Sequence, residues 1–221
     1  MLCSVRGMIV LDIETSGLAG NCGIWQICAI NLDDAPNYFL QESRVDDDDL
    51  IQEGALKVTG KTREELLDVT KQSQKQMILN YFNWVRNQPE KIFFGQNVGW
   101  DICMIQDKCF KYGITDLFSE IHGLRGNDLH TLAQDKYYEL HGRYFLNDKG
   151  RSNMSLPNIL NFCGIPDKRI KLEKEKVVRA GTVHNAFEDC QLEGEVLYRF
   201  KFGKNFFSEY SKFEIPYYLR K

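Results

Sequence analysis

The segment MIVLDIETSGL, residues 8–18, places the strongest constraint on how this chain of 221 residues can fold. Residues 7–13 are apolar on both faces, which predicts a central strand of a sheet that is covered on both sides. Asp12 and Glu14 stand at the end of this strand, and a buried carboxylate is costly unless it has a partner, is solvated or binds a metal ion. A salt bridge, a strand end that reaches solvent and a metal site are all open at this point.

Composition limits the class of protein. A length of 221 residues, with 43% hydrophobic and 27% charged residues, suits one domain with a substantial core. No apolar run approaches the roughly 20 residues that a membrane span needs, and the first residues lack the pattern of a secretory signal. The seven cysteines include no CxxC pair, so neither a disulfide framework nor a zinc ribbon is indicated. We therefore expect no membrane association and a cytoplasmic or other reducing compartment.

The net charge of −3 limits how the chain could hold a polyanion. Proteins that bind nucleic acid through charge alone are usually basic. A polyanion would have to be bound locally here, through a metal ion or a basic patch. The basic stretches 142–151 and 168–179 could supply such a patch, and a solvated loop or linker is the alternative interpretation of each.

The expected secondary structure predicts an α/β domain. The elements are strands at 7–13, 23–31, 37–41, 91–95 and near 117–127, and helices at 71–87, 101–112, after Asp128, after Ser155 and at 184–202. This order predicts a mixed five-stranded sheet with helices on both faces, antiparallel at first and with parallel crossovers later. We expect one domain over residues 1–202, and an aromatic and basic tail, 203–221, that packs on the domain or on a partner.

Two groups of residues receive ordinary structural interpretations. The run Asp46 to Asp49 lacks the alternating ligands, central glycine and final glutamate of an EF-hand. Because acids are favourable at a helix N-terminus, we interpret this run as a first helical turn. His122, His130 and His141 lack the spacing of metal ligands and are interpreted as surface or loop residues.

Further acids occur where α/β sheets gather their ligand sites. Asp12 and Glu14 are two residues apart on a strand, so they point to one face, where their repulsion favours a cation such as Mg²⁺ or Mn²⁺. Asp101 follows the fourth expected strand, near the end of the first. His184 opens the last helix, and Asp189 follows it by about one and a half turns. Four such acids could hold two divalent ions about 4 Å apart that activate water and orient a phosphodiester, with His184 taking the proton.

The segments DIETSGL, QNVGWD and HNAFED, in this order, resemble the three motifs of the DEDDh family of 3′→5′ exonucleases. This family includes epsilon-type proofreading subunits, RNase T and oligoribonuclease, and the likeness covers most of the chain. It implies an RNase H-like fold in which Asp12 bridges two metal ions. Glu14 and Asp189 would hold the first ion with it, and Asp101 would order the second. His184 would be the general base.

The same resemblance implies contacts with the substrate. Thr15 and Leu18 would contact the 3′-terminal nucleotide through backbone and apolar packing. Asn97 is a further candidate, and Trp100 would either pack beside the site or stack on a base. Gln96 stands where the family often has histidine, which we expect to alter packing or substrate contact rather than the chemistry.

The sequence thus predicts a metal-dependent enzyme that releases nucleoside 5′-monophosphates from single-stranded DNA or RNA 3′ ends. A homodimer is plausible by analogy with the family, with the aromatic tail as a candidate surface. One alternative is a catalytically silent binding module of the same fold, for nucleic acid or protein. Another is a phosphoesterase that acts on small molecules. A silent module would tolerate loss of an acid or of the histidine, and none of the five is missing.

Overall fold

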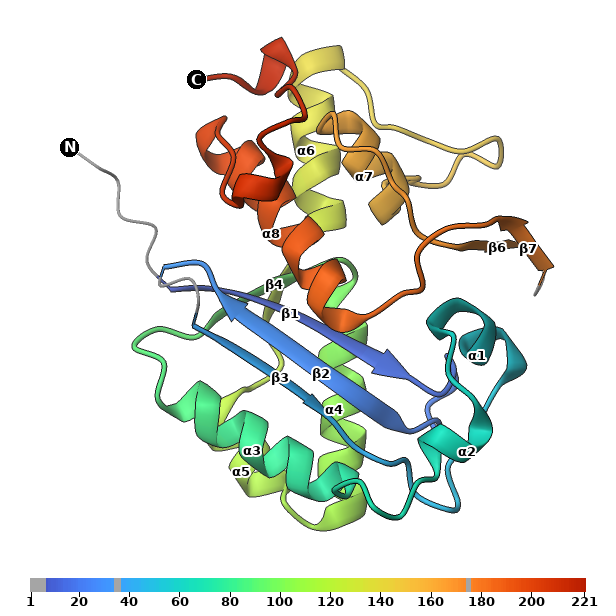
Figure 1. Cartoon of the computed structure of the whole chain (residues 1–221). Coiled ribbons are helices and arrows are strands. Elements are labelled where there is room, and N and C mark those ends of the chain that lie inside the picture. The colour runs from blue at the N-terminus through green and yellow to red at the C-terminus, as the bar shows by residue number, and fades with distance from the viewer. Residues whose placement is uncertain (1–6, 34–36, 174–175) are drawn as a thin grey trace.

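A five-stranded mixed sheet forms the centre of the computed structural model, which describes residues 7–33, 37–173 and 176–221 (Figure 1). In chain order its strands are β1 (Met8–Thr15), β2 (Ile24–Asn31), β3 (Tyr38–Glu42), β4 (Ile92–Gly95) and β5 (Gly126–Asp128). The spatial order is β3-β2-β1-β4-β5. The first three strands pair antiparallel, whereas β4 runs parallel to β1 and β5. The predicted α/β fold class, with its mixed five-stranded sheet, is confirmed.

Helices cover both faces of this sheet (Figure 1). One face carries α3 (Gln74–Arg86), α4 (Val98–Tyr112) and α5 (Thr115–Ile121). The other carries α6 (Leu129–His141), α7 (Leu156–Phe162) and α8 (Ala186–Phe202). The remaining elements are the short helices α1 (Glu53–Thr59) and α2 (Arg63–Leu66), the hairpin of β6 (Lys171–Glu173) and β7 (Lys176–Arg179), and two 3₁₀ helices, Ser208–Tyr210 and Tyr217–Leu219.

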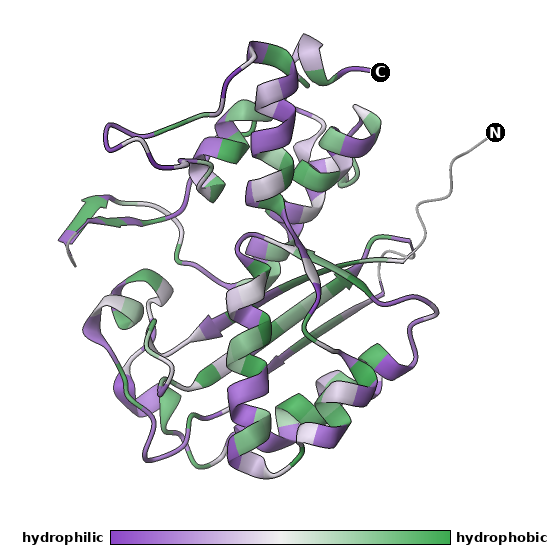
Figure 2. Cartoon of the chain, turned by 180° about the vertical axis from the view of Figure 1, so that it is seen from behind, coloured by the Kyte–Doolittle hydropathy of each residue, from purple (hydrophilic) through white to green (hydrophobic). Residues whose placement is uncertain are grey.

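Strand β1 divides its side chains between two hydrophobic cores. Ile9 and Leu11 pack toward α3 and α4, and Met8 and Val10 pack toward α6, α7 and α8. Because side chains alternate along a strand, Asp12 continues the second series and projects on the α8 face. The central strands are mainly apolar along their length (Figure 2). The acids of β1 therefore occupy the end of a strand that is otherwise a core element.

Two predictions about secondary structure are wrong. Residues 117–121, expected within a strand, lie in α5, where Phe118 and Ile121 have helical spacing and are buried against the same core as α3 and α4. The run Asp46–Asp49 forms a turn ahead of α1 rather than the first turn of a helix. Lys108 on α4 explains this difference, because its Nζ lies 2.6 Å from Oδ1 of Asp49 with both side chains buried.

His122 lies in the turn after α5, so its interpretation as a loop residue is right, but its ring does not lie free on the surface. The ring is half-buried and stacks on Phe93 with 4.0 Å between ring centroids. Its Nε2 lies 2.9 Å from the hydroxyl of Tyr81. Burial lowers the pKa of His122 to about 4.

The tail, residues 203–221, packs on α7 and α8. Arg199 on α8 is fully buried, and its guanidinium donates to the carbonyl oxygens of Tyr210 and Phe213 at 3.2 and 3.1 Å. Glu195, 2.9 Å from Arg199, accepts from the backbone N–H of Phe206 and of Phe207. The two buried charges are thus paired and also bind the tail backbone. No helix among the described residues is both long and apolar enough to cross a membrane.

Candidate active site

The candidate site lies at the carboxyl end of β1, on the α8 face of the sheet. Asp12 is half-buried, and its Oδ2 is covered without a hydrogen-bond partner. Glu14 is half-buried and stands opposite Gln26 of β2 in the antiparallel register. The register shifts after Glu14, at Thr15, where β1 ends. Strand β1 therefore places both carboxylates at its carboxyl end, where its regular pairing with β2 is interrupted.

Helix α4 brings the third acid to the same place. Asp101 lies in its first turn, is 5% exposed and accepts a hydrogen bond of 3.2 Å from the backbone N–H of Ile13, between the two β1 acids. Close approach of β4 to β1 positions this helix. A Cβ atom at Gly95 would lie 2.6 Å from the carbonyl oxygen of Leu11, so a residue without a side chain is needed there.

The start of α8 brings the histidine and the fourth acid. Asn185 caps the helix by accepting from the N–H of Glu188, and Gln26 of β2 accepts from the N–H of Ala186 at 2.7 Å. The helix end is thereby fixed against the strand residue that faces Glu14. Nδ1 of His184 lies 3.4 Å from Oδ2 of Asp189, and Nε2 lies 3.0 Å from the carbonyl oxygen of Ile170.

The structure brings the five residues of the three motifs together. Ligand atoms of Glu14, His184 and Asp189 all lie within 4.8 Å of one another. Asp101 bonds the backbone beside Asp12, and the charges of the other three acids all act on Asp12.

Two further charged residues of the site escaped the sequence reasoning. Glu193 on α8 is 1% exposed, and its charge acts on Asp12. Its spacing of four residues from Asp189, one helical turn, was a signal that could have identified it. Arg169 is 6% exposed and pairs with Asp189, with Nη1 and Oδ1 3.0 Å apart. It lies in the basic stretch 168–179, and only its folded position distinguishes it from the neighbouring lysines. We call Asp12, Glu14, Asp101, Asp189 and Glu193 the acidic cup.

Crowding and burial disfavour the charged forms of Asp12, Glu14 and Asp101. Burial raises the pKa of Asp12 well above its usual value, and Glu193, Asp189, Asp101 and Glu14 add to this. Burial also raises the pKa of Glu14 to about 8, with Asp189 adding to the shift while His184 and Arg169 oppose it. The pKa of Asp101 is raised by burial too, despite its bond from Ile13.

His184 shows the opposite balance. Burial lowers its pKa, but the contact with Asp189 outweighs burial, so the pKa of His184 stands above its usual value. The contact with Asp189 therefore favours the protonated form of the His184 ring.

The donor set of the cup fits divalent cations. Carboxylate oxygens are the hard ligands that Mg²⁺ and Mn²⁺ prefer. Oδ2 of Asp12 and Oε2 of Glu193 are buried with no hydrogen-bond partner among the described residues. Unpaired buried carboxylate oxygens are costly, and a cation is the partner that removes this cost.

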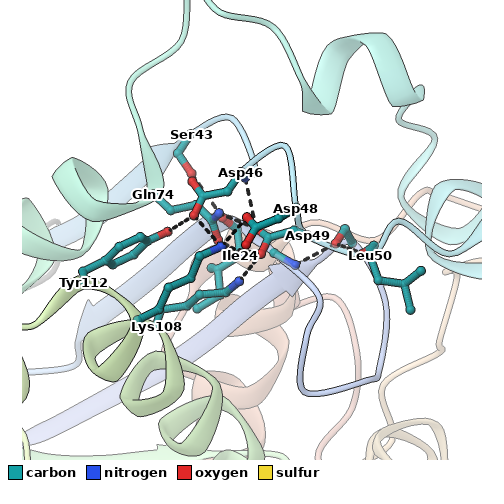
Figure 3. A network of polar contacts seen from close by, with 12 residues as sticks. Ile24, Ser43, Asp46, Asp48, Asp49, Leu50, Gln74, Lys108 and Tyr112 are labelled. Atoms are coloured by element: carbon teal, nitrogen blue, oxygen red, sulfur yellow. Dashed lines mark hydrogen bonds and ion pairs between the residues drawn. The ribbon is translucent and has the colours of Figure 1, made fainter.

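A second acidic group, the loop cluster of Asp46, Asp48 and Asp49, is arranged differently (Figure 3). Lys108 and Lys111 of α4 supply its cations: Nζ of Lys111 lies 2.8 Å from Asp46 and 2.6 Å from Asp48. Further donors come from Tyr112 to Asp46 and from Gln74 to Asp49. Each of these acids is thus paired with a lysine of the chain itself.

The loop cluster supports the segment after β1. The hydroxyl of Ser16 donates to the carbonyl of Leu50 at 2.6 Å, and the N–H of Gln52 donates to the carbonyl of Ser16 at 2.7 Å. Oε1 of Gln52 accepts from the N–H of Leu18 at 2.8 Å. These hydrogen bonds connect the segment that carries Leu18 to the loop after Asp49, and Asp49 is itself paired with Lys108 of α4.

The predicted substrate contacts are placed as follows. Thr15 is buried, and its hydroxyl donates to the carbonyl of Gly17 at 2.7 Å. Leu18 is 81% exposed at the rim beyond β1. Asn97 is exposed between β4 and α4, and its N–H donates to Asp128 at 3.1 Å. Trp100 is half-buried and packs against the core formed with α3, α4 and α5.

Comparison with known proteins shows the fold. No protein-family model and no curated protein matches the chain. Escherichia coli exonuclease I in complex with a dT13 oligonucleotide is similar with a TM-score of 0.65 and 18% identity, over 88% of this chain and 41% of that chain. Cell-death related nuclease 4 (CRN-4) is similar with a TM-score of 0.62 and 14% identity, over 88% of this chain and 63% of that chain.

Both similar proteins are longer than this chain. The chain spans less than two thirds of the length of exonuclease I or of CRN-4. The shared feature is the mixed sheet with helices on both faces. The RNase H-like fold expected from the sequence is thereby confirmed.

Proposed function

We propose that this protein is a metal-dependent 3′→5′ exonuclease that hydrolyses phosphodiester bonds at single-stranded ends and releases nucleoside 5′-monophosphates. The observation that carries the proposal is the acidic cup beside His184, in which buried carboxylate oxygens lack partners. The similar structures include two nucleases, and one is an exonuclease bound to a single-stranded oligonucleotide. Both facts support a nucleic-acid 3′ end as the substrate, with DNA and RNA as the two candidates.

Two divalent ions, Mg²⁺ or Mn²⁺, would supply an activated water and stabilise the leaving oxygen. Asp12 would hold both ions. Glu14 and Asp189 would hold the first, which agrees with their common position beside His184. Asp101 would order the second. Arg169 would keep Asp189 oriented through the guanidinium contact at 3.0 Å.

His184 would act as the general base. Its Nε2 faces the carbonyl oxygen of Ile170 and so carries a hydrogen, which leaves Nδ1 as the nitrogen that takes up a proton. Nδ1 lies on the side of Asp189, toward the cup. The proton of the attacking water would pass to this atom.

Substrate binding would use the rim of the site. Leu18 is exposed on a segment whose backbone is held by Gln52, which suits apolar packing against the terminal base. The side chain of Thr15 is engaged with Gly17, so its contribution would come from the backbone. Asn97 would contact the strand from the start of α4. Trp100 packs on the core, which favours a role beside the site over base stacking.

The proposal includes the organisation of the chain. Residues 1–202 would form the exonuclease domain, and residues 203–221 a tail docked on α7 and α8. The outer face of the docked tail, where Tyr217 is 81% exposed, is the candidate surface for a homodimer, which sedimentation of the intact chain would detect. A reducing intracellular compartment remains our expectation from the cysteines.

The test uses 5′-labelled single-stranded RNA and DNA of matched sequence, with Mg²⁺ or Mn²⁺ and then with a chelator. The proposal expects a ladder that shortens from the 3′ end only with metal and is absent for Asp12→Asn. Tight binding without shortening would favour the silent module instead. Turnover of a nucleotide ester with inert oligonucleotides would favour the small-molecule phosphoesterase.

A further inference from the structure

Helix α8 presents one more acidic side chain to the sheet than the three motifs contain. Asp189 and Cys190 lie on its inner face, and Sγ of Cys190 is 3.4 Å from the carbonyl oxygen of Cys28 and 3.7 Å from that of Val10. Glu193 follows Asp189 by four residues, so the two side chains share one face of the helix. Glu193 is therefore directed toward the sheet where α8 crosses β1 and β2.

Glu193 is buried with its carboxylate only partly satisfied, by a hydrogen bond from the backbone N–H of Gln96. It is 1% exposed, and its Oε2 has no hydrogen-bond partner among the described residues. Glu195, two residues later, provides the contrast. It is equally buried, but its oxygens accept from Arg199 and from the N–H of Phe206 and of Phe207. Glu195 thus has a hydrogen-bond partner for each carboxylate oxygen, whereas Oε2 of Glu193 has none among the described residues.

The neighbours of Glu193 place it in the cup. Among charged groups, Glu193 raises the pKa of Asp12 the most, and Asp189 and Asp101 raise that of Glu193 in addition to burial. The backbone N–H of Gln96, between β4 and α4, opposes this rise in the pKa of Glu193. Glu193 therefore lies among the cup acids, and its buried Oε2 and Oδ2 of Asp12 both lack a hydrogen-bond partner among the described residues.

The cup holds more carboxylates than the chain supplies cations. Its five acids face the guanidinium of Arg169, which pairs with the buried Asp167 as well as with Asp189. Divalent cations from solution would offset this excess of negative charge.

We propose that Glu193 is a fifth acidic residue of the metal site, which joins Asp12 and Asp101 in holding the second divalent cation. This inference rests on the proposed function and deepens it. A second cation with its own carboxylate stays bound when no substrate phosphate is present. The chain therefore takes up two cations before it meets nucleic acid.

The test is calorimetric titration of the intact, metal-free chain with Mn²⁺ in the absence of nucleic acid. We expect two sites in the wild type. Glu193→Gln keeps the size of the side chain and removes its charge, and it weakens the second site roughly 10- to 100-fold. Glu193→Met, which removes both oxygens, does the same. Glu188→Gln is the matched control, because this glutamate is exposed on the first turn of α8, and it leaves both sites unchanged.

The outcomes separate this inference from the proposed function. If both Glu193 variants bind two Mn²⁺ ions as the wild type does, Glu193 is a core residue and the inference is overturned, while the exonuclease proposal stands. If the wild type binds no Mn²⁺, both are overturned. Melting of the metal-free proteins controls for folding. We expect the Glu193 variants to melt at or above the wild-type temperature, because a buried unpaired charge is removed. If neither variant folds, the carboxylate is structural and the inference fails.

Discussion

The two acidic groups of this molecule differ in where their positive charge comes from. The loop cluster lies against Lys108 and Lys111, and each of its acids has a lysine within 3.1 Å (Figure 3). The acidic cup contains more carboxylates, of which Asp189 pairs with Arg169 while oxygens of Asp12 and Glu193 remain unpaired. The cup includes Asp101 in the first turn of α4, whereas the loop cluster lies against Lys108 and Lys111 near the end of the same helix.

The two groups also differ in the pKa values of their acids. Burial raises the pKa of Asp49, but the bonds from Lys108 and Gln74 outweigh it, so the pKa of Asp49 ends below its usual value. In the cup, burial and neighbouring acids act together, and the pKa values of Asp12 and Glu14 rise. The acids of the loop cluster are paired with lysines and hold a loop. The cup acids keep buried oxygens without a partner among the described residues, and we propose that cations from solution bind there.

The largest expected effect is the loss of cleavage when Asp12 of the acidic cup is replaced. Asp12→Asn should reduce 3′-end shortening of a labelled oligonucleotide by about 10³-fold or more, because charge stabilisation by metal ions contributes several kcal/mol. Asp48→Asn is the matched change in the loop cluster and should leave the rate within about twofold, since the metal chemistry is assigned elsewhere. Equal losses in the two variants would mean that the groups do not differ in function.

His184 distinguishes catalysis from metal binding within the cup. His184→Gln should slow cleavage by about 10²- to 10⁴-fold, the usual contribution of a general base. Mn²⁺ uptake should persist because the carboxylates remain. Rates from single-turnover cleavage and affinity from calorimetry give the two values, and loss of Mn²⁺ binding would make this residue a ligand instead.

Lys108 tests the structural role of the loop cluster. Lys108→Met leaves the buried Asp49 without its closest cation, and breaking such a pair costs about 3 kcal/mol of unfolding free energy. Urea denaturation of the metal-free chain measures it. Arg86→Met is the control, because the pair with Glu120 is exposed and is worth no more than about 1 kcal/mol. An unchanged midpoint for Lys108→Met would show that this pair does not hold the loop.

The pH dependence of stability should run in opposite directions for the two groups. The folded state raises the pKa of Glu14 from 4.5 to about 8, so it binds more protons than the unfolded chain, and metal-free stability falls as pH rises between these values. The pKa of Asp49 is lowered, so its contribution is present above its usual 3.8 and is lost as pH falls. Melting temperatures across pH measure both. A Glu14→Gln variant with an unchanged slope would contradict this assignment.

The smallest expected effect concerns the rim. Leu18→Ala removes an exposed side chain, so stability should not change. Loss of part of a leucine contact with the terminal base costs about 1 kcal/mol, which raises KM roughly fivefold. Thermal melting and steady-state kinetics report the two quantities, and an unchanged KM would remove Leu18 from the substrate site.

The sequence predicted the parts of the cup that local geometry determines. Asp12 and Glu14 were placed on one face by the alternation of a strand, and the last helix was expected from His184, two residues before α8 begins at Ala186. Asp101 could be located because it follows a strand that was recognisable. These features depend on a few neighbouring residues, which a sequence displays directly.

The remaining parts depend on contacts between distant residues. The sequence does not distinguish Glu193 from Glu195, and only the tail and Arg199 show that Glu195 is satisfied while Oε2 of Glu193 is not. The lysine partners of the loop cluster could not be recognised, because Lys108 is 59 residues away from Asp49. The ring of His122 is covered by Phe93, which lies on β4, a distant part of the chain.

The most direct test of the central claim is a crystal of the intact chain soaked in Mn²⁺ and examined by anomalous scattering. The account predicts two peaks in the acidic cup, about 4 Å apart, with the carboxylate of Asp12 between them. It predicts no peak among Asp46, Asp48 and Asp49. Manganese at the loop cluster with an empty cup would contradict the account.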